Sequence, residues 1–112
     1  GGNQVKITSF NRNTNLHSYW DSEIVEFVHK WSYSEWQYQI DRASAEEESK
    51  IVAGDFDTWA KESVNIARGI YADTPEGTRV SYDYGAKYAT TVEQQLLKGG
   101  LRLAHLLNEI YK

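Results

Sequence analysis

The chain has 112 residues, of which 40% are hydrophobic and 13% aromatic, and 12 Lys and Arg against 16 Asp and Glu give a net charge of −4. This composition can bury one core, so it excludes an intrinsically disordered chain. The negative net charge argues against a protein that binds the phosphate backbone of nucleic acid non-specifically through a basic face. The sequence contains no cysteine, which excludes disulfides and thiolate zinc sites. It also has no run of about 18 apolar residues, so we expect no membrane span.

Residues 3–10 are predicted to form a strand, because Val5 and Ile7 alternate with Lys6 and Thr8. This is the only strand that the sequence predicts. A strand without a neighbour leaves its backbone donors and acceptors unpaired. We therefore expect a partner strand from outside this sequence or from a second copy. Residues 11–14 are rich in Asn and are expected to form a turn.

A helix is predicted over residues 16–31, with Asn15 as its N-cap. Its apolar side chains recur at helical spacing. They are Leu16, Trp20, Ile24, Phe27, Val28 and Trp31. His17 and Asp21 lie four residues apart at one margin of this stripe, half sheltered by it, so they are neighbours on the helix surface.

Further helices follow along the chain. A short one is expected near Trp36 and Ile40, and a second runs from the cap Ser44 to Gly54. Asp57 is expected to cap a third helix, which stops at residues 73–77. A long helix is predicted over residues 82–111, with either close approach of another helix or a break at residues 99–100. The predicted fold is mainly α, a helical bundle with one N-terminal β-strand.

The three histidines differ in their expected surroundings. Helical geometry places His29 and His105 away from the apolar stripes, so both should face solvent. Only His17 combines shelter with a carboxylate at the right spacing. A zinc ion needs three or four ligands, so His17 and Asp21 form half a site at most. From spacing alone, a surface hydrogen bond between them is the simpler interpretation. The aromatic residues at 31, 33, 36 and 38 are expected to pack rather than to stack on bases.

The motif Asn15-Leu16-His17-Ser18-Tyr19-Trp20-Asp21, preceded by Gly1-Gly2-Asn3, resembles one family. That family is the zinc-dependent single-strand nucleases and 3′-nucleotidases of the S1/P1 type, which share their fold with zinc-dependent phospholipase C. Later segments agree with this resemblance over nearly the whole chain. They are Trp59-Ala60, Glu62-Ser63, Ile66-Ala67, Tyr71, Gly100, Arg102-Leu103-Ala104 and Leu107-Asn108. The resemblance implies that residues 1–112 are the C-terminal part of a single nuclease domain whose upstream half is not in this sequence.

The resemblance also implies the chemistry. It assigns His17 and Asp21 to one zinc of a three-zinc cluster, with the other ligands upstream, including the N-terminal residue. The family hydrolyses single-stranded DNA and RNA to 5′-phosphate products, and a negatively charged chain can do so because bound cations supply the positive charge. Gly2 and Asn3 match residues that contact a base edge in the nucleotide pocket. This fragment alone should be inactive.

The resemblance implies several partners and a compartment. They are a single-stranded nucleic acid or 3′-nucleotide as substrate, the missing N-terminal part of the same protein, and an extracytosolic or secreted location. Two alternatives stay open from the sequence. One is a non-catalytic helical module, and the other is a zinc-dependent phospholipase C.

Overall fold

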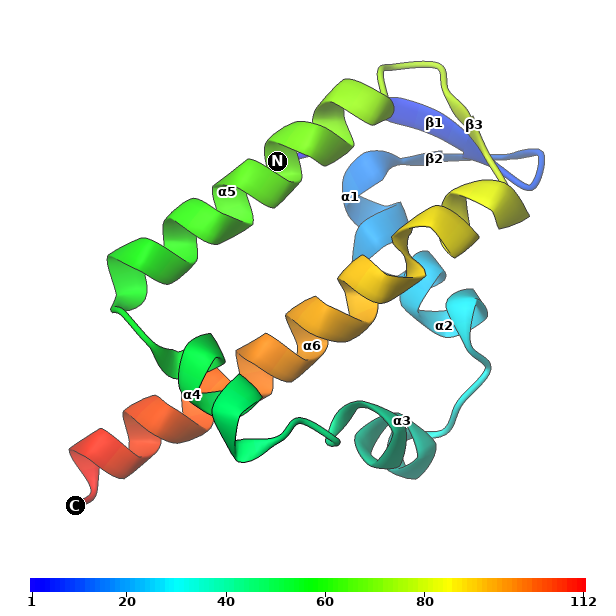
Figure 1. Ribbon diagram of the computed structural model, residues 1–112. Helices are drawn as coiled ribbons and strands as arrows, with labels where there is room; N and C mark the ends of the chain where they lie inside the picture. Colours follow the sequence, from blue (N-terminus) through cyan, green and yellow to red (C-terminus); the bar gives the residue numbers. More distant parts are fainter. The chain divides into compact units, whose positions relative to one another are not determined.

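The computed structural model describes all residues 1–112 and is mainly helical, as predicted (Figure 1). The helices are α1 (Leu16–Ser18), the π-helical turn η1 (Tyr19–Glu23), α2 (Ile24–Val28), α3 (Tyr33–Ile40), α4 (Ala45–Val52), α5 (Phe56–Asp73) and α6 (Tyr82–Ile110). The strands are β1 (Lys6–Ser9), β2 (Arg12–Asn15) and β3 (Arg79–Val80). Two compact units share these elements, residues 1–30 with 60–89, and residues 31–59 with 90–112. No helix is both long and apolar enough to cross a membrane.

The first unit contains a three-stranded sheet in the order β2-β1-β3. β1 pairs antiparallel with β2, with Ser9 opposite Arg12, and parallel with β3, with Ser9 opposite Val80. Phe10 and Asn11 form the two-residue turn with φ of 49° and 67°, the left-handed pair that a tight hairpin requires. The prediction of a lone strand is therefore wrong, because β1 finds both neighbours within the chain. A partner from outside is not needed.

The hairpin turn is held by aromatic packing. Phe10 contacts Phe27 edge-on, with ring centroids 5.3 Å apart, and Tyr82 at 4.9 Å. A non-glycine residue with positive φ is uncommon, so these contacts offset the cost of the conformation. The packing fixes the start of β2, which leads directly into α1.

The helical segment that follows the sheet begins as predicted, with the Asn15 side chain accepting a bond of 2.9 Å from the Ser18 amide. It ends three residues early, since His29 is extended with φ −135° and ψ 130°. Residues 29–31 were expected to be helical and are not. The core of the unit consists of buried side chains from these elements. They are Ile7, Leu16, Tyr19, Ile24 and Val80, with the polar residues Ser9 and Thr74.

The second unit is organised around Trp59, which is 7% exposed. Its indole donates to the Ala53 carbonyl at 3.0 Å, and the Arg102 guanidinium lies over its ring at 5.3 Å. The His105 ring packs edge-on against it at 6.3 Å, so the prediction that His105 faces solvent is wrong. His29, in the first unit, is half-buried as well.

Side-chain caps begin the helices of the second unit. Ser32 caps α3 in a reciprocal capping box with Glu35, and Ser44 caps α4 as predicted. The cap of α5 is Asp55, whose carboxylate accepts from the Thr58 amide at 2.9 Å, and not Asp57. The bonds from Thr58 lower the pKa of Asp55 below its usual range. Helix α6 runs unbroken through Gly99 and Gly100.

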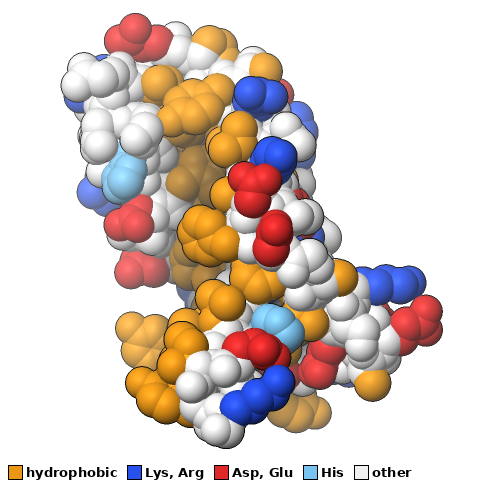
Figure 2. All heavy atoms as spheres, turned by 90° about the vertical axis from the view of Figure 1, so that its left-hand side faces the viewer, with side chains coloured by type: hydrophobic (Ala, Val, Ile, Leu, Met, Phe, Trp, Pro, Cys, Tyr) orange, Lys and Arg blue, Asp and Glu red, His pale blue; other side chains and the backbone are white.

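Several apolar side chains of the second unit stay exposed. Tyr33 and Tyr38 are 96% and 72% exposed, so the prediction that they pack is wrong, whereas Trp31 and Trp36 pack together at 4.9 Å. Apart from the adjoining backbone of α6 itself, nothing lies within 4 Å of the position where a Cβ of Gly100 would be, so the expected close approach of another helix does not occur. Figure 2 shows hydrophobic side chains at the surface, among charges of both signs.

Candidate active site

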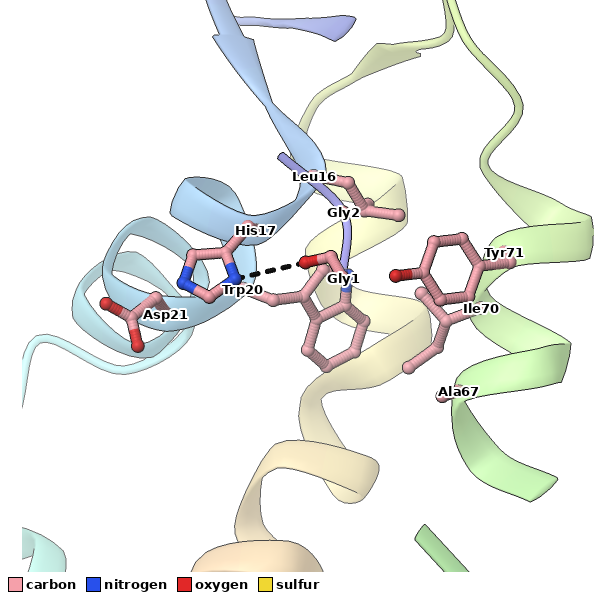
Figure 3. Close-up of a pocket in the computed structure, with 9 residues that line it drawn as sticks. All are labelled: Gly1, Gly2, Leu16, His17, Trp20, Asp21, Ala67, Ile70 and Tyr71. Carbon is pink, nitrogen blue, oxygen red and sulfur yellow. Dashed lines mark hydrogen bonds between the residues drawn. The ribbon is translucent and has the colours of Figure 1, made fainter. Parts of the chain in front are cut away.

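A pocket of about 350 Å³ lies in the first unit, beside the N-terminal residues (Figure 3). Residues from the N-terminus, the first helical segment and α5 line it. They are Gly1, Gly2, Leu16, His17, Trp20, Asp21, Ala67, Ile70 and Tyr71. The lining is mostly apolar, and His17 and Asp21 supply its polar side chains apart from the Tyr71 hydroxyl. This combination is typical of sites in which apolar walls hold a ligand and a few polar groups orient it.

His17 and Asp21 come from two different kinds of helical turn. His17 belongs to α1, and Asp21 belongs to the π-helical turn η1, which closes with a bond from the Ile24 amide to the Tyr19 carbonyl. In a regular α-helix four residues overshoot one turn by about 40°. A π turn is wider, so the angle between the two side chains differs from that in a regular α-helix. Both side chains nevertheless line the same pocket.

The His17 ring is oriented by the backbone of Gly1. Its Nδ1 lies 3.1 Å from the Gly1 carbonyl oxygen. A carbonyl can only accept, so Nδ1 is the donor, and in the neutral ring this tautomer leaves the lone pair on Nε2. Figure 3 shows Nε2 on the side of the ring that faces Asp21. A histidine that binds a metal is usually held in this way, with one nitrogen bonded to a carbonyl and the other free to ligate.

Both side chains are exposed, so the prediction that they are half sheltered is wrong. Leu16, Tyr19 and Ile24 of the same segment are buried, whereas the pair lines the pocket from the exposed side of the segment. No group of three or more His, Cys, Asp or Glu side chains in the 112 residues is arranged to hold a metal ion. The imidazole and the carboxylate are donors that zinc accepts. The pair therefore fits part of a zinc site and leaves positions for ligands from elsewhere.

Gly2 is fixed by contact with His17. Its φ is 87°, and its carbonyl accepts from the amides of Val5 at 3.2 Å and His17 at 3.3 Å. A Cβ on Gly2 would lie 2.9 Å from the His17 backbone nitrogen. Packing alone thus requires glycine here, and a base contact by Gly2 stays a prediction.

Asn3, the other predicted nucleotide-binding residue, is exposed and does not line the pocket. Its backbone carbonyl accepts from Lys6 Nζ at 3.1 Å. The structure thus brings His17, Asp21 and Gly2 together and leaves Asn3 beside them. Its proposed contact with a base remains a prediction.

Helix α5 supplies one wall of the pocket, which was not predicted from the sequence. Ala67, Ile70 and Tyr71 have the spacing of one helix face. Figure 3 shows the Tyr71 hydroxyl directed toward Gly1. An apolar stripe of this kind usually marks a core face, so the sequence held no signal that distinguishes a pocket wall from ordinary packing.

Comparison with known proteins places the chain among nucleases. The family model described as S1/P1 nuclease matches residues 1–112. Endonuclease 3 of Arabidopsis thaliana is 30% identical over 129 residues, which cover 99% of this chain and 43% of that protein. Endonuclease 4 of the same plant is 30% identical over 126 residues, with 99% and 42% covered. The chain thus spans less than half the length of these relatives.

Proposed function

Because the chain belongs to the S1/P1 nuclease family, we propose that it is part of a metal-dependent nuclease that hydrolyses phosphodiester bonds of single-stranded DNA and RNA. The same site would release phosphate from 3′-nucleotides and leave 5′-phosphate ends on polymers. The matched relatives carry the name endonuclease, which supports the nuclease over a purely structural helical module. No feature of the pocket favours a phospholipase C.

His17 and Asp21 are the residues of this chain that we assign to metal binding, as two ligands of one zinc in a three-zinc cluster. The observation that carries the assignment is the bond from His17 Nδ1 to the Gly1 carbonyl, at 3.1 Å. It holds the ring so that Nε2 is available on the side of Asp21. Bound zinc would supply positive charge for the phosphate and lower the pKa of a bound water.

The other residues of the site bind and orient the substrate in this proposal. Asn3 is exposed, with its side chain available for a base edge, and Gly2 allows backbone to come close to that base. An unpaired base presents such an edge and a paired one does not, which accounts for a preference for single strands. The apolar pocket walls exclude water from one side of the His17–Asp21 pair.

We assign the remaining metal ligands to a part of the protein outside these 112 residues. The 112 residues would then form the C-terminal part of one nuclease domain. Two ligands are too few for stable zinc, and the relatives are more than twice as long as the matched region. The 112-residue chain alone is therefore expected to be inactive. By family resemblance the whole protein works outside the cytosol.

The test compares the 112-residue chain with the product of the complete gene on single-stranded DNA, on 3′-AMP and on phosphatidylcholine vesicles. The complete product should cleave the first two in a zinc-dependent manner, and His17→Ala or Asp21→Ala should lower that rate by about 100-fold or more. His105→Ala, which removes a histidine of the other unit, is the matched control and should keep the rate. Full activity of both ligand variants would favour the non-catalytic module.

A further inference from the structure

The turn that carries Asp21 lacks the regular hydrogen bonding of an α-helix. The Tyr19 amide bonds to the Leu16 carbonyl three residues back, and the Ile24 amide bonds to the Tyr19 carbonyl five residues back. A helix with such mixed spacing does not define its own side-chain directions as sharply as an α-helix does. Contacts from outside the turn must therefore fix the direction of Asp21.

One chain of hydrogen bonds reaches this turn from elsewhere in the unit. The indole Nε1 of Trp20, the neighbour of Asp21, donates to the Tyr84 hydroxyl at 3.0 Å. That hydroxyl lies 2.7 Å from Thr74 Oγ1. Tyr84 stands in the first turn of α6, and Thr74 directly follows α5. The three residues thus connect the π turn to the ends of both long helices.

Burial restricts the movement of the three side chains that form these hydrogen bonds. Thr74 is 0% exposed, and Trp20 and Tyr84 are half-buried. The Tyr84 ring meets Tyr19 edge-on at 5.5 Å and Trp20 at 6.3 Å. A hydrogen bond removed at such a place leaves the indole N–H without a partner, and few waters can replace it.

We propose that Tyr84 is a positioning residue: through Trp20 it fixes the π-helical turn and so holds Asp21 at the pocket that His17 also lines. Any effect of Tyr84 on catalysis rests on the proposed function, in which His17 and Asp21 bind a metal ion. Tyr84 itself does not line the pocket and touches no reacting atom. The hydroxyl of Tyr84 acts through its bond to Trp20, which does line the pocket.

The same helix offers a matched control. Tyr88 lies one turn further along α6, its hydroxyl donates to Asp73 Oδ2 at 2.8 Å, and its ring also contacts Trp20, at 5.2 Å. Tyr84→Phe and Tyr88→Phe each remove one bonded hydroxyl and keep the ring. Only Tyr84→Phe removes the partner of the Trp20 indole.

The experiment uses the product of the complete gene, in which the remaining proposed metal ligands are present, and both variants of it, with two readouts by NMR. The first is hydrogen exchange of the Ile24 amide, which closes the π turn, expressed relative to amides of β1. The second is the change in the NMR signals of the His17 ring when Zn²⁺ alone is added, with the signals of the His29 and His105 rings as internal references. We expect Tyr84→Phe to speed the relative exchange of Ile24 about tenfold and to weaken zinc binding at His17 roughly three- to tenfold. Tyr88→Phe should change neither.

Equal exchange of Ile24 in the two variants would overturn the proposal, and so would faster exchange with unchanged zinc affinity at His17. A complete wild-type protein whose His17 ring signals do not change with zinc would instead argue against the metal assignment under the proposed function. In that case the hydrogen exchange of the Ile24 amide still tests whether Tyr84 fixes the π turn, so the two failures are distinguishable.

Discussion

Replacing Gly2 by alanine tests the contact between the N-terminal residues and His17. Gly2 and Gly77 lie in the same unit and have nearly the same φ, 87° and 86°. A Cβ on Gly77 would meet nothing within 4 Å, whereas a Cβ on Gly2 would lie 2.9 Å from the His17 nitrogen and 3.3 Å from its Cα. Gly77→Ala therefore measures the cost of the backbone conformation alone, and Gly2→Ala adds the clash.

The expected magnitudes follow from these two terms. An L-residue in the left-handed region costs about 1 kcal/mol or somewhat more, which is the loss expected for Gly77→Ala. Forcing a methyl group against backbone costs about 1–3 kcal/mol further, so Gly2→Ala should lose about 2–4 kcal/mol. Because His17 moves with the clash, its Nδ1 should also lose the bond to the Gly1 carbonyl.

Urea unfolding of the two variants measures the first effect, and the ¹⁵N shifts of the His17 ring measure the second. The ring of wild-type protein should show Nδ1 protonated, and Gly2→Ala should shift it toward a mixture of tautomers. If Gly2→Ala cost no more than Gly77→Ala and left the His17 ring unchanged, the contact described between Gly2 and His17 would be refuted.

Three further predictions concern stability. Gly100→Ala should stabilise the chain by about 1 kcal/mol in urea unfolding, because the site is open; a loss of stability would show that something covers this face. Tyr19→Phe should be neutral or slightly stabilising, because the hydroxyl is buried without a partner; a loss above about 1 kcal/mol would reveal a bond to that hydroxyl. Burial raises the pKa of Tyr84 above its usual 10, so the stabilisation that its neutral hydroxyl contributes is complete below pH 10 and is lost as the pH rises further. Tyr84→Phe should therefore flatten the decline of stability at alkaline pH in urea unfolding, and an unchanged decline would contradict this.

Long periodic segments were predictable from sequence. The 29 residues of α6 carry an apolar stripe at helical spacing throughout, and Gly99 and Gly100 were too few to break it. The end of α5 at Asp73 was equally clear, because Pro75 follows. The spacing of His17 and Asp21 also predicted correctly that both side chains lie on the same face of the helical segment, where they line one pocket.

Tertiary contacts decided what the sequence left open. Arg12–Asn15 shows no alternation of apolar and polar residues, so nothing marked β2 as a strand; pairing with β1 defines it. Asp55 and Asp57 are equally good caps by type, and the position of the first helical residue selects Asp55. His105 was expected to face water because it lies off the apolar stripe of its own helix, and the helical pattern carries no information on its contact with Trp59, which is distant in sequence.

The most direct test of the central assignment is the location of zinc in crystals of the complete gene product, by anomalous diffraction at the zinc edge. We expect a zinc ion bonded to His17 Nε2 and to a carboxylate oxygen of Asp21, at about 2.0–2.2 Å. An active, zinc-loaded protein with no zinc at His17 and Asp21 would contradict it.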